Sequence, residues 1–190
     1  MAKGGGYERE ISKKLSLWWT YGKRDDIFWR TAGSGGRATT RMKTRKKTAD
    51  SAGDLMALSK IGKPFTKRFL VEIKRGYSKK KGAVAVLNLL DSKKLGKTNA
   101  VLLTWVKKAL LEMKQHKRRD IIIIFRRDRK EACVVLEEHL YKRLDMDANN
   151  RLLLYINEYK LVIILLEHFL EVNPAYFGAK QSKRNITRRR

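Results

Sequence analysis

Two stretches decide how this sequence is interpreted: Gly-Asp-Leu at residues 53–55 and Phe-Leu-Val-Glu-Ile-Lys at residues 69–74. They predict neighbouring β-strands over residues 54–58 and 69–75, joined by a turn through residues 60–64. Side chains alternate between the two faces of a strand, so Glu72 and Lys74 share one face. Asp54 opens the first strand, and we expect its carboxylate to lie beside that of Glu72.

Charged side chains inside an apolar strand are costly unless they are paired or hold a metal ion. Two converging carboxylates, from Asp54 and Glu72, suit a hard divalent cation that prefers oxygen ligands. Lys74, one pleat away, could hold or activate a water molecule that the metal polarises. The pattern therefore predicts a phosphodiester-cleaving site. The alternative is an ion-pair network on a half-exposed sheet face.

A Glu-x-Lys triplet is a weak signal, because lysine is common in this chain. Glu158-Tyr159-Lys160 has the same form and also lies near an apolar run. However, Glu158 follows Asn157 in a predicted hairpin turn, and no Gly-Asp strand precedes it. We therefore favour Glu72 over Glu158 as the site residue.

The composition points to a polyanionic partner. The 190 residues include 45 basic and 19 acidic ones, which gives a formal net charge of +26. Nucleic acid is the first candidate, and a membrane surface is the rival. The basic residues are spread over predicted loops and both ends rather than along one amphipathic helix, which favours DNA.

Other sequence features exclude several classes of protein. Cys133 is the only cysteine, which excludes disulfides and cysteine-rich zinc sites. The chain starts without an apolar secretion segment, and the apolar run at 161–166 is too short to span a bilayer, so we expect a cytoplasmic protein. There is no glycine-rich phosphate loop, so no nucleotide cofactor is expected. His116, His139 and His168 lack ligand-type spacing and are expected to be surface or packing residues.

Residues 7–20 predict an amphipathic helix. At about 100° per residue, its apolar side chains fall in one arc, which also contains Glu8 but not Glu10. Glu8 is thus aimed at whatever the helix covers and needs a positively charged partner. An active-site cation would satisfy it, and a salt bridge to Arg or Lys at the helix edge is the alternative.

The remaining pattern predicts an alternation of strands and helices. Strands are expected over residues 27–31, 120–125 and 132–136, with a hairpin formed by 152–156 and 160–165. Helices are expected over residues 98–115, 137–144 and 166–172.

Two basic segments flank the site residues in sequence. The first, residues 37–47, has six basic residues and no acidic one; the second follows Arg75 and is rich in glycine and lysine. We interpret both as phosphate-contacting segments rather than merely solvated loops. The candidate DNA-binding residues here are Arg75 and, within the two segments, Arg37, Arg41, Lys43, Arg45, Lys46, Lys47, Lys79 and Lys80.

With these residues in place, the chain resembles the PD-(D/E)xK nuclease superfamily, and within it the archaeal-type Holliday junction resolvases, which phages also encode. The opening Lys-Gly-Gly-Gly-Tyr-Glu-Arg-Glu-Ile at residues 3–11 is similar to a resolvase motif, as is Arg-Thr-Ala-Gly-Ser at 30–34. The Gly-Asp-Leu and Glu-Ile-Lys motifs follow in the order that the family has. The chain departs from the family in its long basic link at 35–52 and in Gly53, which replaces a proline.

The resemblance implies an α/β fold with a restriction-endonuclease-like core, a central mixed β-sheet flanked by helices. It implies hydrolysis with Mg²⁺, or Mn²⁺ as a substitute, by a homodimer acting on four-way DNA junctions. Glu8, Asp54 and Glu72 would support the metal, Lys74 would contact the attacking water or the scissile phosphate, and Arg9, Arg30 and Ser34 would assist.

The expected organisation is a single nuclease domain over residues 1–175, with a basic loop at 35–52 and a basic, flexible tail at 176–190. Two other functions stay open. One is a phage or mobile-element endonuclease acting on other DNA, either sequence-specific or associated with packaging. The other is a non-catalytic DNA-binding protein on the same fold.

Overall fold

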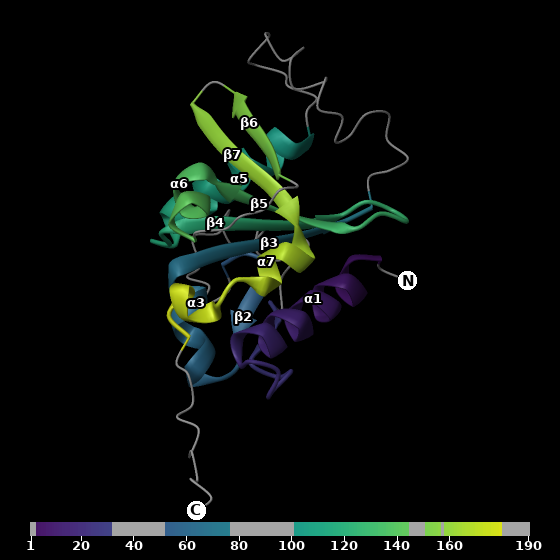
Figure 1. Ribbon diagram of the computed structural model, residues 1–190, viewed down its shortest axis with the longest axis vertical. Coiled ribbons are helices and arrows are strands. Elements are labelled where there is room, and N and C mark those ends of the chain that lie inside the picture. The colour runs from purple at the N-terminus through teal and green to yellow at the C-terminus, as the bar shows by residue number, and fades with distance from the viewer. Residues whose placement is uncertain (1–2, 32–51, 77–100, 145–150, 157, 180–190) are drawn as a thin grey trace, which may run out of the picture.

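The computed structural model describes residues 3–31, 52–76, 101–144, 151–156 and 158–179 (Figure 1). Most of the predicted basic loop, the glycine-lysine segment after Gly76 and the end of the tail lie outside the described residues. So do these candidate site residues: Ser34, Arg37, Arg41, Lys43, Arg45, Lys46, Lys47, Lys79 and Lys80.

A five-stranded sheet forms the centre of the fold, with the strand order β3-β4-β5-β7-β6. β3 and β4 are parallel, and the other neighbours are antiparallel. This mixed sheet flanked by helices confirms the predicted α/β fold and is consistent with a restriction-endonuclease-like core. The strands are β3 (Phe69–Arg75), β4 (Asp120–Arg126), β5 (Ala132–Glu137), β6 (Arg151–Ile156) and β7 (Tyr159–Leu165).

Helices cover both faces of the sheet, as Figure 1 shows. One face packs against α1 (Lys3–Trp19), α7 (Leu166–Glu171) and the 3₁₀ turn η2 (Pro174–Phe177). The opposite face packs against α5 (Val101–Gln115). β4 is buried on both faces, and its isoleucines at 121–124 are fully enclosed, because strands between two layers have no solvent-facing side.

The predicted arc of α1 is buried as expected. Tyr7, Ile11, Leu15, Trp18 and Trp19 are each at most 8% exposed. The helix begins at Lys3, earlier than the predicted residue 7, since three glycines do not prevent its first turn from forming. The burial of this arc sets the rotation of the helix and therefore the direction of Glu8.

The prediction that residues 54–58 pair beside β3 as a strand of the main sheet is wrong. β2 (Leu55–Ala57) instead pairs antiparallel with β1 (Phe28–Arg30) in a separate two-stranded sheet. The connection to β3 is also longer than a turn, because η1 (Lys60–Gly62) leads directly into α3 (Lys63–Arg68). Pro64 stands in the first turn of α3, where its missing N–H costs nothing, and Phe65 anchors the helix in the core.

The C-terminal half follows the predicted order closely. The hairpin of β6 and β7 is confirmed. The helix predicted at 137–144 is also present, as α6 (Glu138–Arg143). Phe177 and Ala179 are buried in the core beneath α1. The packed domain therefore continues past the predicted boundary at residue 175, since Phe177 fills an aromatic cluster with Trp18, Phe69 and Phe169. Within the described residues, no helix is long and apolar enough to cross a membrane.

Candidate active site

Asp54 lies beside the outer edge of β3 and contacts its backbone. β3 is the last strand of the five-stranded sheet, and within the described residues the backbone groups of Val71 and Ile73 that point away from β4 pair with no other strand. The Asp54 N–H donates to the Val71 carbonyl at 2.8 Å, and the Ile73 N–H donates to Asp54 Oδ2 at 2.8 Å. A carboxylate thus occupies a place that an edge strand normally leaves to solvent.

The structure brings Asp54, Glu72 and Lys74 into contact. Lys74 Nζ donates to Asp54 Oδ2 at 3.1 Å and also to Glu72 Oε2. Asp54 and Glu72 are 7% and 3% exposed, so both carboxylates are withdrawn from water. The Lys74 ammonium lies between them and supplies the positive charge that pairs with both carboxylates.

Electrostatics at this cluster depend on burial. Burial raises the pKa of Glu72, and the facing Asp54 carboxylate raises it further, against the opposing effect of Lys74. Burial on its own would lower the pKa of Lys74, but the two carboxylates outweigh it, and the pKa of Lys74 lies above its ordinary value. Two buried anions therefore need a cation between them, and Lys74 is that cation here.

Gly53 fixes the direction of Asp54. Its φ is +68°, and a Cβ at this position would come within 2.5 Å of the Val71 carbonyl oxygen. The Gly53 carbonyl accepts from Thr31 Oγ1 at 2.8 Å, and its N–H donates to Glu112 Oε1 at 2.8 Å. Only glycine combines this left-handed backbone with so close an approach, which explains why no proline precedes the aspartate.

Glu112 and Thr31, which hold the Gly53 backbone, were not predicted as site residues from the sequence. Glu112 lies seven residues after Trp105, which is about 700° of rotation and places it within about 20° of that buried residue. The helical phase that identified Glu8 would also have identified Glu112. Thr31 offered no such signal, because its partner Gly53 is 22 residues away and meets it only in the folded chain.

Replacing Gly53 by alanine is expected to destabilise the fold. The strained φ and the contact with the Val71 carbonyl together should lower the free energy of unfolding by ~2 kcal/mol or more. Gly22→Ala is the matched control, since Gly22 has a φ of +81° but no atom within 4 Å of the added Cβ. Its cost should be ~1 kcal/mol. Equal losses in urea unfolding would show that the contact with Val71 relaxes freely.

Glu8 lies apart from this cluster. α1 packs on the face of β3 that carries Val71 and Ile73, whereas Glu72 and Lys74 point to the other face. Glu8 is 9% exposed and pairs with Arg30, whose Nε is 3.5 Å from Glu8 Oε2. In the described part of the chain, Glu8, Asp54 and Glu72 do not form a set of three ligand atoms within 4.8 Å of one another.

The other described candidates lie outside the cluster. Arg75 follows Lys74 and places its guanidinium 5.8 Å from the centre of the Tyr7 ring, on the α1 side. Arg9 is exposed on α1, and Arg30 ends β1 immediately before Thr31. Glu10 pairs with Lys14 and Arg126. Glu158, from the second Glu-x-Lys triplet, is exposed in the β6–β7 turn and is far in sequence from the site residues.

The chain was compared with known proteins. The model of one family, described as "Phage putative PDDEXK endonuclease", matches residues 1–178. The chain belongs to this phage endonuclease family. No curated protein and no solved structure matches it. The family membership confirms the PD-(D/E)xK superfamily and a phage link. Asp54, Glu72 and Lys74 follow one another in the order of the Asp, the Asp or Glu, and the Lys in the name PD-(D/E)xK.

Proposed function

We propose that this phage-family nuclease is a Mg²⁺-dependent endonuclease that acts in the cytoplasm on four-way DNA junctions, and that Asp54, Glu72 and Lys74 form its catalytic centre. The observation that carries the proposal is the convergence of these three side chains at the free edge of β3. The net charge of +26 supports a polyanionic substrate.

The donor set fits a divalent metal ion. Asp54 and Glu72 supply carboxylate oxygens, the ligands that Mg²⁺ and Mn²⁺ prefer. Both carboxylates are buried and are already arranged around a positive charge, the Lys74 ammonium. When bound, such an ion polarises a phosphate oxygen and lowers the pKa of its bound water. Glu8, which lies on the other face of β3, is proposed as a third residue that supports the metal from beyond the strand edge.

The chain's own groups have separate tasks in this proposal. The Ile73 N–H and the Gly53 backbone hold Asp54 in one orientation. Lys74 stays protonated, because both carboxylates raise its pKa, and its ammonium is available to orient water or stabilise charge on the phosphate. Arg30, Arg9 and Arg75 are proposed to contact the DNA backbone, together with the basic residues at 37–47 and 79–80 and with Ser34.

The junction and dimer parts of the proposal rest on the resolvase resemblance. A four-way junction has two-fold symmetry, so its resolution calls for two sites related by a two-fold axis. The test is cleavage of matched four-way, three-way, flap and linear DNA with Mg²⁺, together with light scattering at micromolar protein. Preferred cleavage of the four-way DNA by a dimer is expected. Equal cleavage of linear DNA by a monomer would instead favour a phage endonuclease of other specificity.

Glu8 and Glu10 provide a test of helix phase. Glu8→Gln should slow metal-dependent cleavage, because it removes the negative charge that the proposal assigns to the metal. Glu10→Gln should change the rate little, since Glu10 is half-exposed and pairs with Lys14 and Arg126. Single-turnover rates at saturating DNA check this. The reverse pattern would remove Glu8 from the proposed site.

A further inference from the structure

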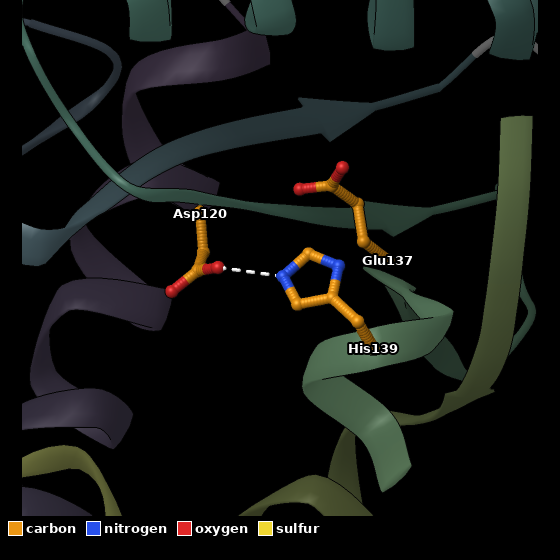
Figure 2. Close-up of side chains that lie close together, drawn as sticks. All are labelled: Asp120, Glu137 and His139. Atoms are coloured by element: carbon orange, nitrogen blue, oxygen red, sulfur yellow. Dashed lines mark hydrogen bonds and ion pairs between the residues drawn. The ribbon is translucent and has the colours of Figure 1, made fainter. Parts of the chain in front are cut away.

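A group of side chains that could hold a metal ion lies at the end of the strands remote from Lys74. Asp120, Glu137 and His139 each offer one ligand atom, and these three atoms lie within 4.8 Å of one another. Figure 2 shows the three side chains, which come from the start of β4, the end of β5 and the first turn of α6. The folded sheet brings Asp120 to the other two, since it precedes Glu137 by more than a strand length in the sequence.

This group is separate from the candidate active site. In the parallel register of β3 and β4, Asp120 lies opposite Phe69, whereas Glu72 lies opposite Ile123. Three residues of strand correspond to roughly 10 Å. Asp120 also shares the strand face of Ile122 and Ile124, towards α1, while Glu72 points to the face that α5 covers. An ion bound at one site would not contact the other.

The donors are mixed and partly pre-positioned. Asp120 is 1% exposed, and its Oδ2 accepts from Arg68 Nε at 3.1 Å, which fixes the carboxylate and leaves Oδ1 facing His139. His139 Nε2 lies 2.8 Å from Asp120 Oδ1. Two ligands that are each ~2.1 Å from a tetrahedral ion are ~3.4 Å apart. A small opening of this hydrogen bond therefore makes room for an ion, with Arg68 supporting the carboxylate from behind.

Charge at this place also points to a cation. Arg68 balances Asp120, but Glu137 has no ion pair with Lys or Arg in the described part of the chain. A bound cation would pair with the Glu137 carboxylate.

We propose that Asp120, Glu137 and His139 form a binding site for a transition-metal ion of the Zn²⁺ class, distinct from the catalytic metal. An imidazole ligand favours Zn²⁺ over Mg²⁺, which prefers oxygen ligands alone. The ion would tie the start of β4 to the end of β5 and to α6. It would thus stabilise the β4–β5 pair at the end of the strands remote from Lys74.

The test is calorimetric titration of the metal-free full-length protein with Zn²⁺, together with thermal unfolding. Zn²⁺ at about a hundred times its Kd should raise Tm by on the order of 5 °C. His139→Ala and Glu137→Gln should each weaken Zn²⁺ binding at least tenfold. Glu137 is half-buried at the end of β5, and His139 lies in α6 with 54% of its side chain exposed, so neither change removes a core residue.

Two controls separate this site from others. His116→Ala removes a histidine outside the group and should leave Zn²⁺ binding unchanged. Glu72→Gln disables the candidate catalytic site and should also leave this binding event in place, so the result does not depend on whether the protein cleaves DNA. Zn²⁺ affinity that is the same in His139→Ala and Glu137→Gln as in the unaltered chain would overturn the proposal, as would the absence of Zn²⁺ binding.

Discussion

Glu72→Gln is expected to reduce DNA cleavage by on the order of 100-fold or more while leaving DNA binding intact or tighter. Glu72 is 3% exposed and shares Lys74 with Asp54, so its carboxylate is a central part of the proposed centre. Glutamine keeps the shape and can still accept a hydrogen bond from Lys74, but it removes the negative charge that a metal ion needs. Removal of an anion close to the phosphate also favours DNA binding.

The matched control is Glu158→Gln, which changes the second Glu-x-Lys triplet of the chain. Glu158 is exposed in the β6–β7 turn, so its replacement should leave the cleavage rate close to that of the unaltered protein. Binding measured by fluorescence anisotropy and cleavage measured in single turnover separate the two effects. Cleavage by Glu72→Gln at an undiminished rate would remove this residue from the catalytic centre.

Lys74→Gln is expected to separate metal binding from catalysis. The ammonium bridges Asp54 and Glu72 and is held in its charged form by both. It therefore competes with a divalent ion for the same two carboxylates. Its removal should tighten Mn²⁺ binding several-fold, while cleavage falls by on the order of 100-fold because charge stabilisation at the phosphate is lost.

Calorimetric titration with Mn²⁺ and single-turnover cleavage together check this expectation. Glu72→Gln is the opposing control, since it should lower both Mn²⁺ affinity and rate. A parallel fall of affinity and rate in Lys74→Gln would mean that the ammonium helps to hold the two carboxylates in place and does not compete with the metal ion for them.

Much of the fold was accessible from local pattern. The arc of α1, the isoleucine run of β4 and the hairpin of β6 and β7 each carry a periodicity or turn signal that one stretch contains completely. The error at residues 54–68 has a different origin. Leu55 to Ala57 have apolar character, but the choice between β1 and β3 as a partner depends on contacts distant in sequence. The short helix α3, with Pro64 in its first turn, was predicted as a turn.

The candidate site was predictable to a similar extent. Alternation along β3 was sufficient to place Glu72 beside Lys74, and the spacing of Asp54 suggested its approach. What the sequence could not give is the means of holding Asp54, because Thr31, Gly53 and Glu112 converge from three separate segments. The group of Asp120, Glu137 and His139 was missed for the same reason, since two of its residues lie on neighbouring strands and none has ligand-type spacing.

The most direct test of the account is Mg²⁺-dependent cleavage of a labelled four-way DNA junction by the unaltered chain and by Asp54→Asn in the same assay. Asp54 accepts hydrogen bonds from Ile73 N–H and Lys74, and asparagine keeps its size while removing its charge. The account predicts cleavage by the unaltered chain with Mg²⁺, none when the ion is chelated, and none by Asp54→Asn under either condition. Cleavage by Asp54→Asn at the rate of the unaltered chain, or cleavage that persists without a divalent ion, would contradict it.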